Sequence, residues 1–368
     1  MPSLHPPTCR AAAPSRLLGV QAGRGVAALL VVLMHVSDML DSPRYFSGPA
    51  FGGVFRFGHA GVDFFFVLSG FIIYHVHHAD IGRPAMLAPY GVKRAVRIYP
   101  VYWVVMALFG AILVFSPTRD RSEQELAQIV GSLLLLPSLR TPIIGVAWTL
   151  RHELLFYLLF ALLILNRGLG RAVLAAWFVL TGWNIAVAWV SGTPWFGGIA
   201  GDLLFRIFNI EFLFGMAVAR ACLRRPSAWG RSLLVAGGGL FLAVGLLESF
   251  GPKEQWEYPP RHLGYALGAA LALYGAVSAE RSGRLRPPAG LVALGTASYS
   301  VYLLHTIVIM ICQVGLLASR PVLAVPREAA FLLITAIAVA AGLVFSRLVE
   351  QPLLRSLRPR RAPQPQAA

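Results

Sequence analysis

Apolar runs of about 20 residues recur along the whole chain, and this repetition constrains the fold more than any other feature. Such a run is long enough for a helix to cross the hydrocarbon core of a bilayer. The chain has 368 residues, of which 57% are hydrophobic and 13% are charged, whereas soluble domains carry about 25% charged residues. No long polar block interrupts the runs, so the sequence predicts one helical membrane domain and no separate soluble domain.

The runs predict an all-α polytopic membrane fold with about ten transmembrane helices. A tail of residues 1–19 precedes this membrane domain, which covers residues 20–352, and a basic tail of residues 353–368 is expected to be disordered. The stretch 129–139 is too short to span a bilayer, so it is expected to lie at the interface or to re-enter the membrane. The expected spans are residues 20–40, 59–77, 99–117, 146–166, 171–192, 202–222, 231–250, 261–279, 293–316 and 328–349.

Basic residues set the expected orientation of these helices. If the N-terminus lies in the cytoplasm, most Lys and Arg residues fall on the cytoplasmic segments and their flanks, as the positive-inside rule requires. An eleventh span over 129–139 would invert every later loop and spoil this bias. The formal net charge of +16 is therefore attributed to topology. Both termini are expected in the cytoplasm, and no nucleic-acid partner is expected.

The spacing of cysteines and histidines indicates neither a disulfide framework nor a metal centre. The three cysteines, Cys9, Cys222 and Cys312, lie far apart. Three histidines cluster in segment 75–78, but a helix places only the first and the last of them on one face. We therefore expect a histidine cluster at the cytoplasmic surface, no metal site and no tightly bound cofactor.

The first span carries two polar residues, Arg24 and His35, that are costly in hydrocarbon. They are 11 positions apart, which places them within roughly 20° on one helix face and separates them by about 16 Å along the axis. One face of this helix thus carries a cation near the cytoplasmic surface and an imidazole in the outer half of the membrane. We interpret them as two functional positions along one route across the membrane. The alternative for Arg24 is that its side chain extends to the interface, whereas His35 is too deep for this.

Two carboxylates are candidates to orient His35. Asp63 comes near the outer end of the second span, at the depth of His35, and an acid beside a histidine favours the charged ring. The alternative is that Asp63 caps the start of its helix. Glu153 forms a polar stripe with Thr149 and Tyr157 at helical spacing, so it is expected to face protein, a cation or a cavity.

Two further segments carry polar groups that are candidates for binding a substrate. Arg94 and Arg97 stand just before the third span, three positions apart, so both guanidinium groups can face one anion. The alternative is that they only mark the cytoplasmic side and contact anionic lipid headgroups. In the ninth span, Ser298, Tyr302 and His305 share one face, with His305 near the middle of the membrane.

Five motifs, in this order and at these spacings, resemble the acyltransferase 3 family. They are RGVAALLVVLMH, GHAGVDFFFVLSGFI, KRAVRIYPVYW, WTLRHELLFY and SYSVYLLH, and the resemblance runs from about Arg24 to Pro352. Members are integral-membrane O-acyltransferases that modify bacterial polysaccharides, lipopolysaccharide O-antigens, macrolides and related glycans. By motif matching, His35 corresponds to the family's essential histidine, and Arg94 and Arg97 to its essential arginines.

The resemblance implies an enzyme of the inner (plasma) membrane with ten helices, surrounded by membrane lipids. Its co-substrate would be acyl-CoA, with acetyl-CoA as the default, bound from the cytoplasmic side. Its acceptor would be a hydroxyl of a glycan such as O-antigen or exopolysaccharide, of a lipid-linked glycan, or of another molecule. The transferase would move the acyl group to that hydroxyl from the membrane or its outer face.

The implied mechanism assigns a role to each candidate residue. Arg24 and the two arginines of the KRAVR motif would hold the phosphates of coenzyme A. His35 would act as general base, oriented by Asp63 or Glu153, with a transient acyl-imidazole as a variant. The hydroxyl groups of Tyr302 or Ser298 would stabilise the thioester oxyanion, and His305 is a further possible substrate contact.

Two competing hypotheses remain from the same polar residues. A proton-coupled transporter would use the intramembrane His, Asp and Glu residues as a proton relay. The sequence shows neither an inverted repeat nor paired Gly/Pro-broken spans, which are typical of many secondary transporters. A flippase-like, non-catalytic partner of a glycan export pathway would tolerate the loss of His35.

Overall fold

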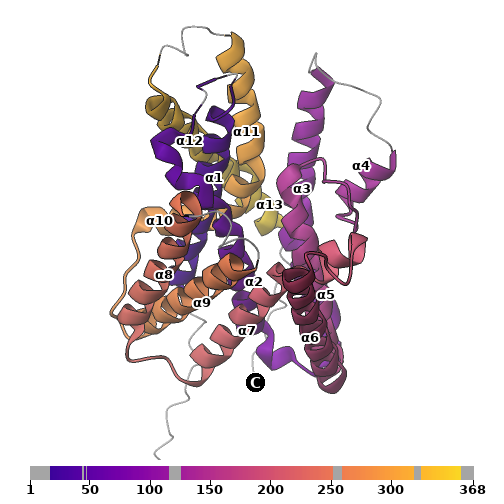
Figure 1. The fold of residues 1–368 in the computed structure, drawn as a ribbon. Coiled ribbons are helices and arrows are strands. Elements are labelled where there is room, and N and C mark those ends of the chain that lie inside the picture. The colour runs from indigo at the N-terminus through magenta and orange to yellow at the C-terminus, as the bar shows by residue number, and fades with distance from the viewer. Residues whose placement is uncertain are drawn as a thin grey trace, which may run out of the picture.

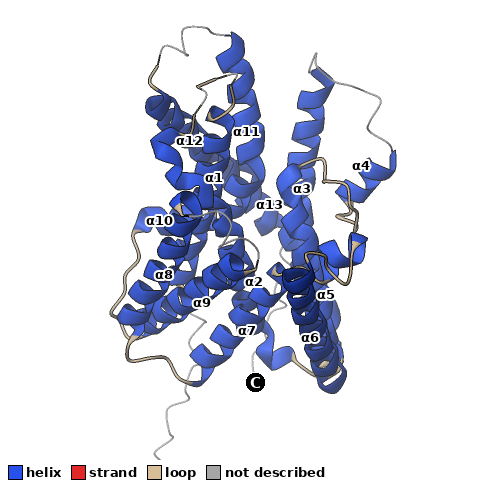
Figure 2. Cartoon of the chain, viewed as in Figure 1, coloured by secondary structure: helices blue, strands red, loops and turns tan. Residues whose placement is uncertain are grey.

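The computed structural model describes residues 17–43, 45–46, 48–115, 126–251, 259–318 and 325–357. Every regular element in these ranges is a helix (Figure 2), which confirms the predicted all-α fold. The long helices are α1 (Leu18–Leu40), α2 (Ala60–His77), α3 (Leu87–Phe115), α5 (Trp148–Leu165), α6 (Arg167–Ser191), α7 (Phe208–Arg224), α8 (Gly230–Phe250), α9 (Pro260–Arg281), α11 (Ser298–Ala318) and α12 (Arg327–Phe345). The short elements are the 3-10 helix η1 (Ala50–His59), α4 (Leu126–Leu133), the π-helices η6 (Ala200–Leu204) and η9 (Ser346–Glu350), α10 (Ala289–Thr296) and α13 (Gln351–Ser356).

The structure describes only the parts of the two predicted tails that adjoin the membrane domain. Residues 1–16 of the N-terminal tail and residues 358–368 of the C-terminal tail lie outside the described ranges. At the N-terminal end, helix α1 begins at Leu18. At the C-terminal end, helix α13 ends at Ser356. Helical structure therefore continues a few residues beyond Pro352, into the segment that was expected to be disordered.

Nine helical segments in the described ranges are long and apolar enough to cross a membrane. They coincide with nine of the ten predicted spans. The remaining span, 202–222, is interrupted: the π-helix Ala200–Leu204 is followed by a turn and then by α7, which has 17 residues. At 1.5 Å per residue α7 is about 26 Å long, slightly less than the roughly 30 Å hydrocarbon core.

Side chains satisfy the backbone groups that the interruption before α7 leaves unpaired. The Asn209 amide donates hydrogen bonds to the carbonyls of Leu203 at 3.0 Å and Leu204 at 2.8 Å. The Trp177 indole of α6 donates to the Leu204 carbonyl as well, at 2.6 Å. Buried carbonyls without such donors would be costly, so these two side chains explain how the break is tolerated.

The third predicted span is longer than expected. Helix α3 begins at Leu87, twelve positions before the predicted start, and its 29 residues measure about 44 Å, more than the bilayer core requires. Arg94 and Arg97 therefore lie on the helix itself and not on a loop before it. The directions of the two side chains therefore depend on how helix α3 is oriented about its axis relative to the helices that it contacts.

Helix α4 (Leu126–Leu133) overlaps only the first part of the short apolar stretch 129–139, and it is too short to span a bilayer. It has 8 residues, or about 12 Å. Three aromatic side chains of α3 donate hydrogen bonds to backbone carbonyls at its C-terminal end: Tyr99 to Leu134 at 3.1 Å, Tyr102 to Ser132 at 2.7 Å and Trp103 to Leu133 at 2.9 Å. Helix α4 is thus held against the side of α3 (Figure 1).

Helix α1 is central to the packing of the site. It contacts α2, α9, α10, α11 and α12 (Figure 1). Helix α2 in turn packs closely on α7, because glycines face each other's backbone. A Cβ atom on Gly70 would lie 2.0 Å from the Phe212 carbonyl oxygen, and one on Gly215 would lie 1.9 Å from that of Val67. This close approach is typical of membrane helices that pack through small residues.

Candidate active site

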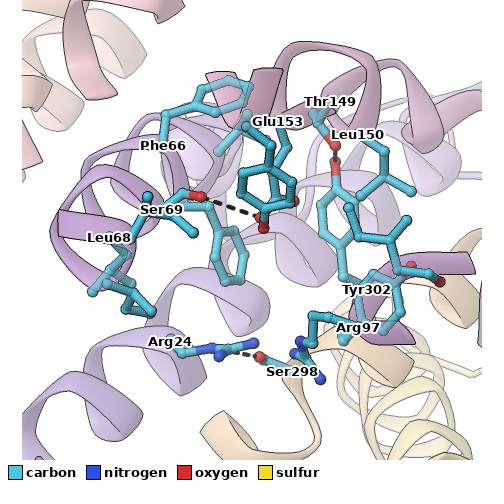
Figure 3. A pocket seen from close by; sticks show the side chains of 17 residues that line it. Arg24, Phe66, Leu68, Ser69, Arg97, Thr149, Leu150, Glu153, Ser298 and Tyr302 are labelled. Carbon is cyan, nitrogen blue, oxygen red and sulfur yellow. Dashed lines mark hydrogen bonds between the residues drawn. The ribbon is translucent and has the colours of Figure 1, made fainter. Parts of the chain in front are cut away.

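The two polar residues of α1 line two different cavities. The first, which we call the arginine cavity, is lined by Arg24 and Arg97 together with Glu153 and by other residues of α2, α3, α5 and α11 (Figure 3). The second, which we call the histidine cavity, is lined by His35 and His59 and by apolar residues of α1, α3, α11 and the segment before α5. One face of α1 therefore serves both cavities, as the helical spacing predicted.

Arg24 points into the bundle and not to an interface. Its Nε donates a hydrogen bond of 3.1 Å to the hydroxyl of Ser298, the first residue of α11 (Figure 3). Ser298 also lines the arginine cavity. The predicted alternative, in which the Arg24 side chain extends to the membrane surface, is therefore not the arrangement observed.

Arg97 is held in the same cavity by a buried acid. Its Nη1 lies 3.0 Å from Oε1 of Glu350, whose side chain is 2% exposed. The other oxygen of Glu350 accepts hydrogen bonds from the hydroxyls of Ser300 at 2.6 Å and Ser346 at 2.9 Å. The Arg97 guanidinium also lies 5.0 Å from the centre of the Tyr299 ring. These contacts fix the orientation of the Arg97 side chain, whereas the side chain of an exposed arginine is free to change its orientation.

Arg94 lies next to the arginine cavity without lining it. Its guanidinium carbon lies 5.6 Å from the ring centre of Tyr157, which does line the cavity, and 6.0 Å from that of Tyr90. Its Nε is buried and has no hydrogen-bond partner among the residues that the structure describes. The two arginines of α3 therefore differ: Arg97 is paired with an acid, and Arg94 stacks near aromatic rings.

The polar stripe of α5 faces the arginine cavity, as its spacing predicted. Thr149, Glu153 and Tyr157 all line it. Glu153 accepts hydrogen bonds from the Ser69 hydroxyl at 3.1 Å and from the Tyr157 hydroxyl. The carboxylate is thus bound by two hydroxyl groups in a cavity that also contains Arg24 and Arg97, so it balances part of their charge.

His35 is oriented by a second histidine. Its Nδ1 lies 2.9 Å from the Val31 carbonyl oxygen and 3.3 Å from Nε2 of His305, and the ring centres are 4.8 Å apart. Because a carbonyl oxygen can only accept, we assign the proton of His35 to Nδ1. The Nδ1 of His305 lies 3.3 Å from the Val301 carbonyl and carries its proton by the same reasoning. The Nδ1–H of His35 is then shared between the Val31 carbonyl and the Nε2 lone pair of His305, and the Nε2 atom of His35 is left as the basic nitrogen.

The prediction that a carboxylate orients His35 is not met by the geometry. Asp63 is bound to His262 of α9, with its Oδ1 2.5 Å from Nδ1 of that ring. Gly61 is the α2 residue that faces α1, since a Cβ atom there would lie 2.3 Å from the Ala27 carbonyl oxygen. Asp63, two positions later, is rotated by about 200° around the helix and so points away from α1. Glu153 lies in the other cavity.

The role of His305 as the partner of His35 does not follow from the sequence. His305 was predicted as a substrate contact on a shared face with Tyr302, but its side chain is 0% exposed and contacts His35 instead. The only signal in the sequence was its place near the middle of the ninth span. Nothing in the spacing showed that this face of α11 meets the C-terminal half of α1.

Two residues line both cavities and separate them: Val62 of α2 and Tyr302 of α11. The Tyr302 hydroxyl lies 3.1 Å from the Val146 carbonyl oxygen and 3.1 Å from the hydroxyl of Thr149. Figure 3 shows Thr149 and Tyr302 joined in this way at the edge of the arginine cavity. Val62 and Tyr302 therefore mark the boundary at which the two cavities adjoin.

Comparisons with known proteins give the family. A family model described as an acyltransferase domain, acyltransferase 3, matches residues 17–347. The exopolysaccharide production protein ExoZ of Rhizobium meliloti (strain 1021) is 30% identical over 325 residues, which cover 84% of this chain and 94% of that protein. Protein 2 in the picA locus of Rhizobium radiobacter is 28% identical over 169 residues, which cover 40% of this chain and 82% of that protein. No solved structure matches the chain. The chain is a multi-pass membrane acyltransferase and belongs to the acyltransferase 3 family.

Proposed function

We propose that this acyltransferase moves an acyl group, with acetyl as the first candidate, from cytoplasmic acyl-CoA to a hydroxyl group of a cell-surface polysaccharide or its lipid-linked precursor. The observation that carries the proposal is the arrangement of α1. Arg24 and His35 line two cavities that meet at Val62 and Tyr302. One cavity offers guanidinium groups for an anionic donor, and the other offers a basic imidazole nitrogen.

The donor fits the arginine cavity. Coenzyme A carries phosphates, which guanidinium groups bind through paired hydrogen bonds. Arg24 and Arg97 both line this cavity, and Arg94 lies behind Tyr157 at its edge. The distribution of Lys and Arg supports a cytoplasmic position for the N-terminal end of α1, the side on which acyl-CoA is available. The pantetheine arm would then extend along α1 towards Tyr302.

The chemistry fits the histidine cavity. Nε2 of His35 takes the proton from the acceptor hydroxyl while the hydroxyl oxygen attacks the thioester carbonyl. The carbon–sulfur bond then breaks, and the proton passes to the departing thiolate of coenzyme A. The Val31 carbonyl at 2.9 Å and His305 at 3.3 Å share the Nδ1–H of His35 and so hold the ring in the required tautomer. The Tyr302 hydroxyl donates to the Val146 carbonyl at 3.1 Å, so its proposed role is to line the boundary between the two cavities, and the oxyanion is not assigned to it.

The acceptor is inferred from the relatives. ExoZ is named for exopolysaccharide production, and it matches this chain over most of both proteins. A saccharide hydroxyl is a weak nucleophile that needs a general base, which is the role given to His35. An enzyme that modifies such a glycan during export would lie in the inner membrane, with its histidine cavity towards the outer face.

A direct assay of acyl transfer tests the proposal. The purified protein in detergent or nanodiscs is incubated with labelled acetyl-CoA and de-O-acylated exopolysaccharide oligosaccharides, and the products are analysed by mass spectrometry. We expect acetylated oligosaccharide with the wild type and none with His35→Ala, while both proteins bind acetyl-CoA. Equal transfer by the two proteins would contradict the mechanism. The absence of acyl-CoA binding by the wild type would contradict the donor assignment.

A further inference from the structure

A third polar cluster lies apart from both cavities. It consists of Asp63 on α2, Glu211 on α7 and His262 on α9, and we call it the acidic triad. None of the three lines the arginine cavity or the histidine cavity. Helices α2 and α7 meet closely at Gly70 and Gly215, so the triad joins three tightly packed helices. The mechanism proposed above gives it no role, and the inference below does not depend on that mechanism.

The three side chains are buried and converge. Their relative exposures are 1% for Asp63, 1% for Glu211 and 6% for His262. One ligand atom from each residue lies within 4.8 Å of the other two. Nδ1 of His262 lies 2.5 Å from Oδ1 of Asp63 and 3.9 Å from Oε1 of Glu211. The ring nitrogen and the two carboxylates therefore surround one small volume.

Glu211 is the unusual member of the triad. Neither of its carboxylate oxygens has a hydrogen-bond partner within the described ranges. A buried carboxylate in this condition is unstable unless it gains a proton or a cation. The neighbouring carboxylate Glu248 shows the usual solution, because it contacts His59 at 2.7 Å, Arg261 at 3.0 Å and the Tyr265 hydroxyl at 2.5 Å.

The nearby cations whose contacts are known are bound to other acids. Arg261 and His59 contact Glu248, and Arg206 pairs with Asp202 at 3.7 Å at an exposed position. His262 itself is bound to Asp63. One imidazole thus faces two carboxylates, and both oxygens of Glu211 are without a hydrogen-bond partner in the described part of the chain.

We propose that the acidic triad binds one divalent transition-metal ion, with Zn²⁺ as the first candidate. Imidazole nitrogen and carboxylate oxygen are both ligands that Zn²⁺ accepts. Tetrahedral ligands at about 2.0–2.2 Å from the ion are separated by about 3.4 Å, and the distances of 2.5 Å and 3.9 Å lie on either side of this value. The ion would replace the proton between His262 and Asp63, neutralise Glu211 and link α2, α7 and α9.

The competing explanation is a proton shared between the carboxylates, and an amide substitution separates the two. In Glu211→Gln the side chain keeps its shape and is neutral, like a protonated glutamate, but it is a poor metal ligand. A metal site predicts that this variant loses the ion and unfolds at a lower temperature. A shared proton predicts a variant that is at least as stable as the wild type. Asp202→Asn is the matched control, because Asp202 is exposed and outside the triad.

The experiment uses the full-length protein, purified with an affinity tag that contains no histidines and without chelator. Metal content is measured by inductively coupled plasma mass spectrometry, and the Tm is measured before and after chelation and after addition of Zn²⁺, Mn²⁺ or Mg²⁺. We expect one ion per chain in the wild type and in Asp202→Asn, a Tm that falls on chelation and recovers with Zn²⁺, and no ion in Glu211→Gln. A wild-type protein that contains no transition metal and whose Tm responds to neither chelator nor added ions overturns the proposal, even if Glu211→Gln does not fold.

Discussion

The two cavities along α1 differ in the kind of polar group that they present. In the arginine cavity the charged groups are several and already paired, as Arg97 is with Glu350 and Arg24 is with Ser298. In the histidine cavity the imidazole of His35 is surrounded mainly by apolar side chains, and it is its Nδ1, not its Nε2, that faces the Val31 carbonyl. Several donors in a fixed arrangement suit the recognition of an anion, whereas an imidazole in a mainly apolar setting suits proton transfer.

The comparison separates donor recognition from chemistry, so variants in the two cavities are expected to change different kinetic constants. A change in the histidine cavity should lower kcat and leave donor binding intact. A change in the arginine cavity should raise the KM for acyl-CoA with a smaller effect on kcat.

Replacing His35 should have the largest effect. His35→Ala removes the general base, and we expect kcat to fall by roughly 10²–10⁴-fold, with an unchanged Kd for acyl-CoA. The control is His59→Gln, because His59 lines the same cavity but its Nε2 is bound to Glu248 at 2.7 Å. Single-turnover acylation and titration calorimetry measure the two quantities. A larger loss in the control than in His35→Ala would refute the assignment of the base.

Replacing His305 tests whether the histidine pair acts as a unit. His305→Leu removes one of the two acceptors of the His35 Nδ1–H and leaves the Val31 carbonyl, and it should lower kcat by about 10–100-fold, as the loss of groups that orient a functional histidine usually does. His305→Gln keeps an acceptor near the position of Nε2 and should recover much of the rate. If Leu and Gln give the same activity with the same Tm, His305 has only a packing role.

The sequence predicted features that belong to single helices and failed on those that depend on how helices are rotated against each other. Apolar run length was sufficient for nine spans, and helical phase was sufficient for the common face of Arg24 and His35. The partner of His35 was not predicted, for two reasons. Gly61 is the residue of α2 that faces α1, so Asp63 lies on another face of α2, and α11 places His305 next to His35. A single sequence contains no direct record of these contacts.

The same limit explains the span that did not form as predicted. The composition of 202–222 is apolar enough for a membrane helix, but the chain is interrupted before α7. The interruption is stabilised by Asn209 from the helix itself and by Trp177 from α6. The hydrogen bond from α6 is a tertiary contact, and local hydrophobicity does not report it.

Replacing Arg97 should affect the donor and the fold together, and a second substitution separates the two effects. Arg97→Met should raise the KM for acyl-CoA by about tenfold, the usual loss for one charge-assisted contact. It also leaves Glu350 buried without its cation, which costs about 3–5 kcal/mol of folding free energy. The double variant Arg97→Met/Glu350→Gln should regain stability in thermal denaturation but not donor affinity. A double variant with a normal KM would remove Arg97 from the donor site.

The smallest effect on rate is expected where the two cavities meet. Tyr302→Phe loses the hydrogen bonds to Val146 and Thr149 at 3.1 Å, and the acetyl-transfer rate should fall by no more than about tenfold, the energy of one or two neutral hydrogen bonds. Tyr302→Ala instead widens the connection between the cavities, so the ratio of kcat/KM for butyryl-CoA to that for acetyl-CoA should rise. Tyr299→Phe is the control, because Tyr299 lines only the arginine cavity and its hydroxyl contacts the Ile98 carbonyl at 2.8 Å. An unchanged ratio in Tyr302→Ala, in a protein that still transfers acetyl groups, would show that the acyl group does not pass Tyr302 and that donor and base meet by another route.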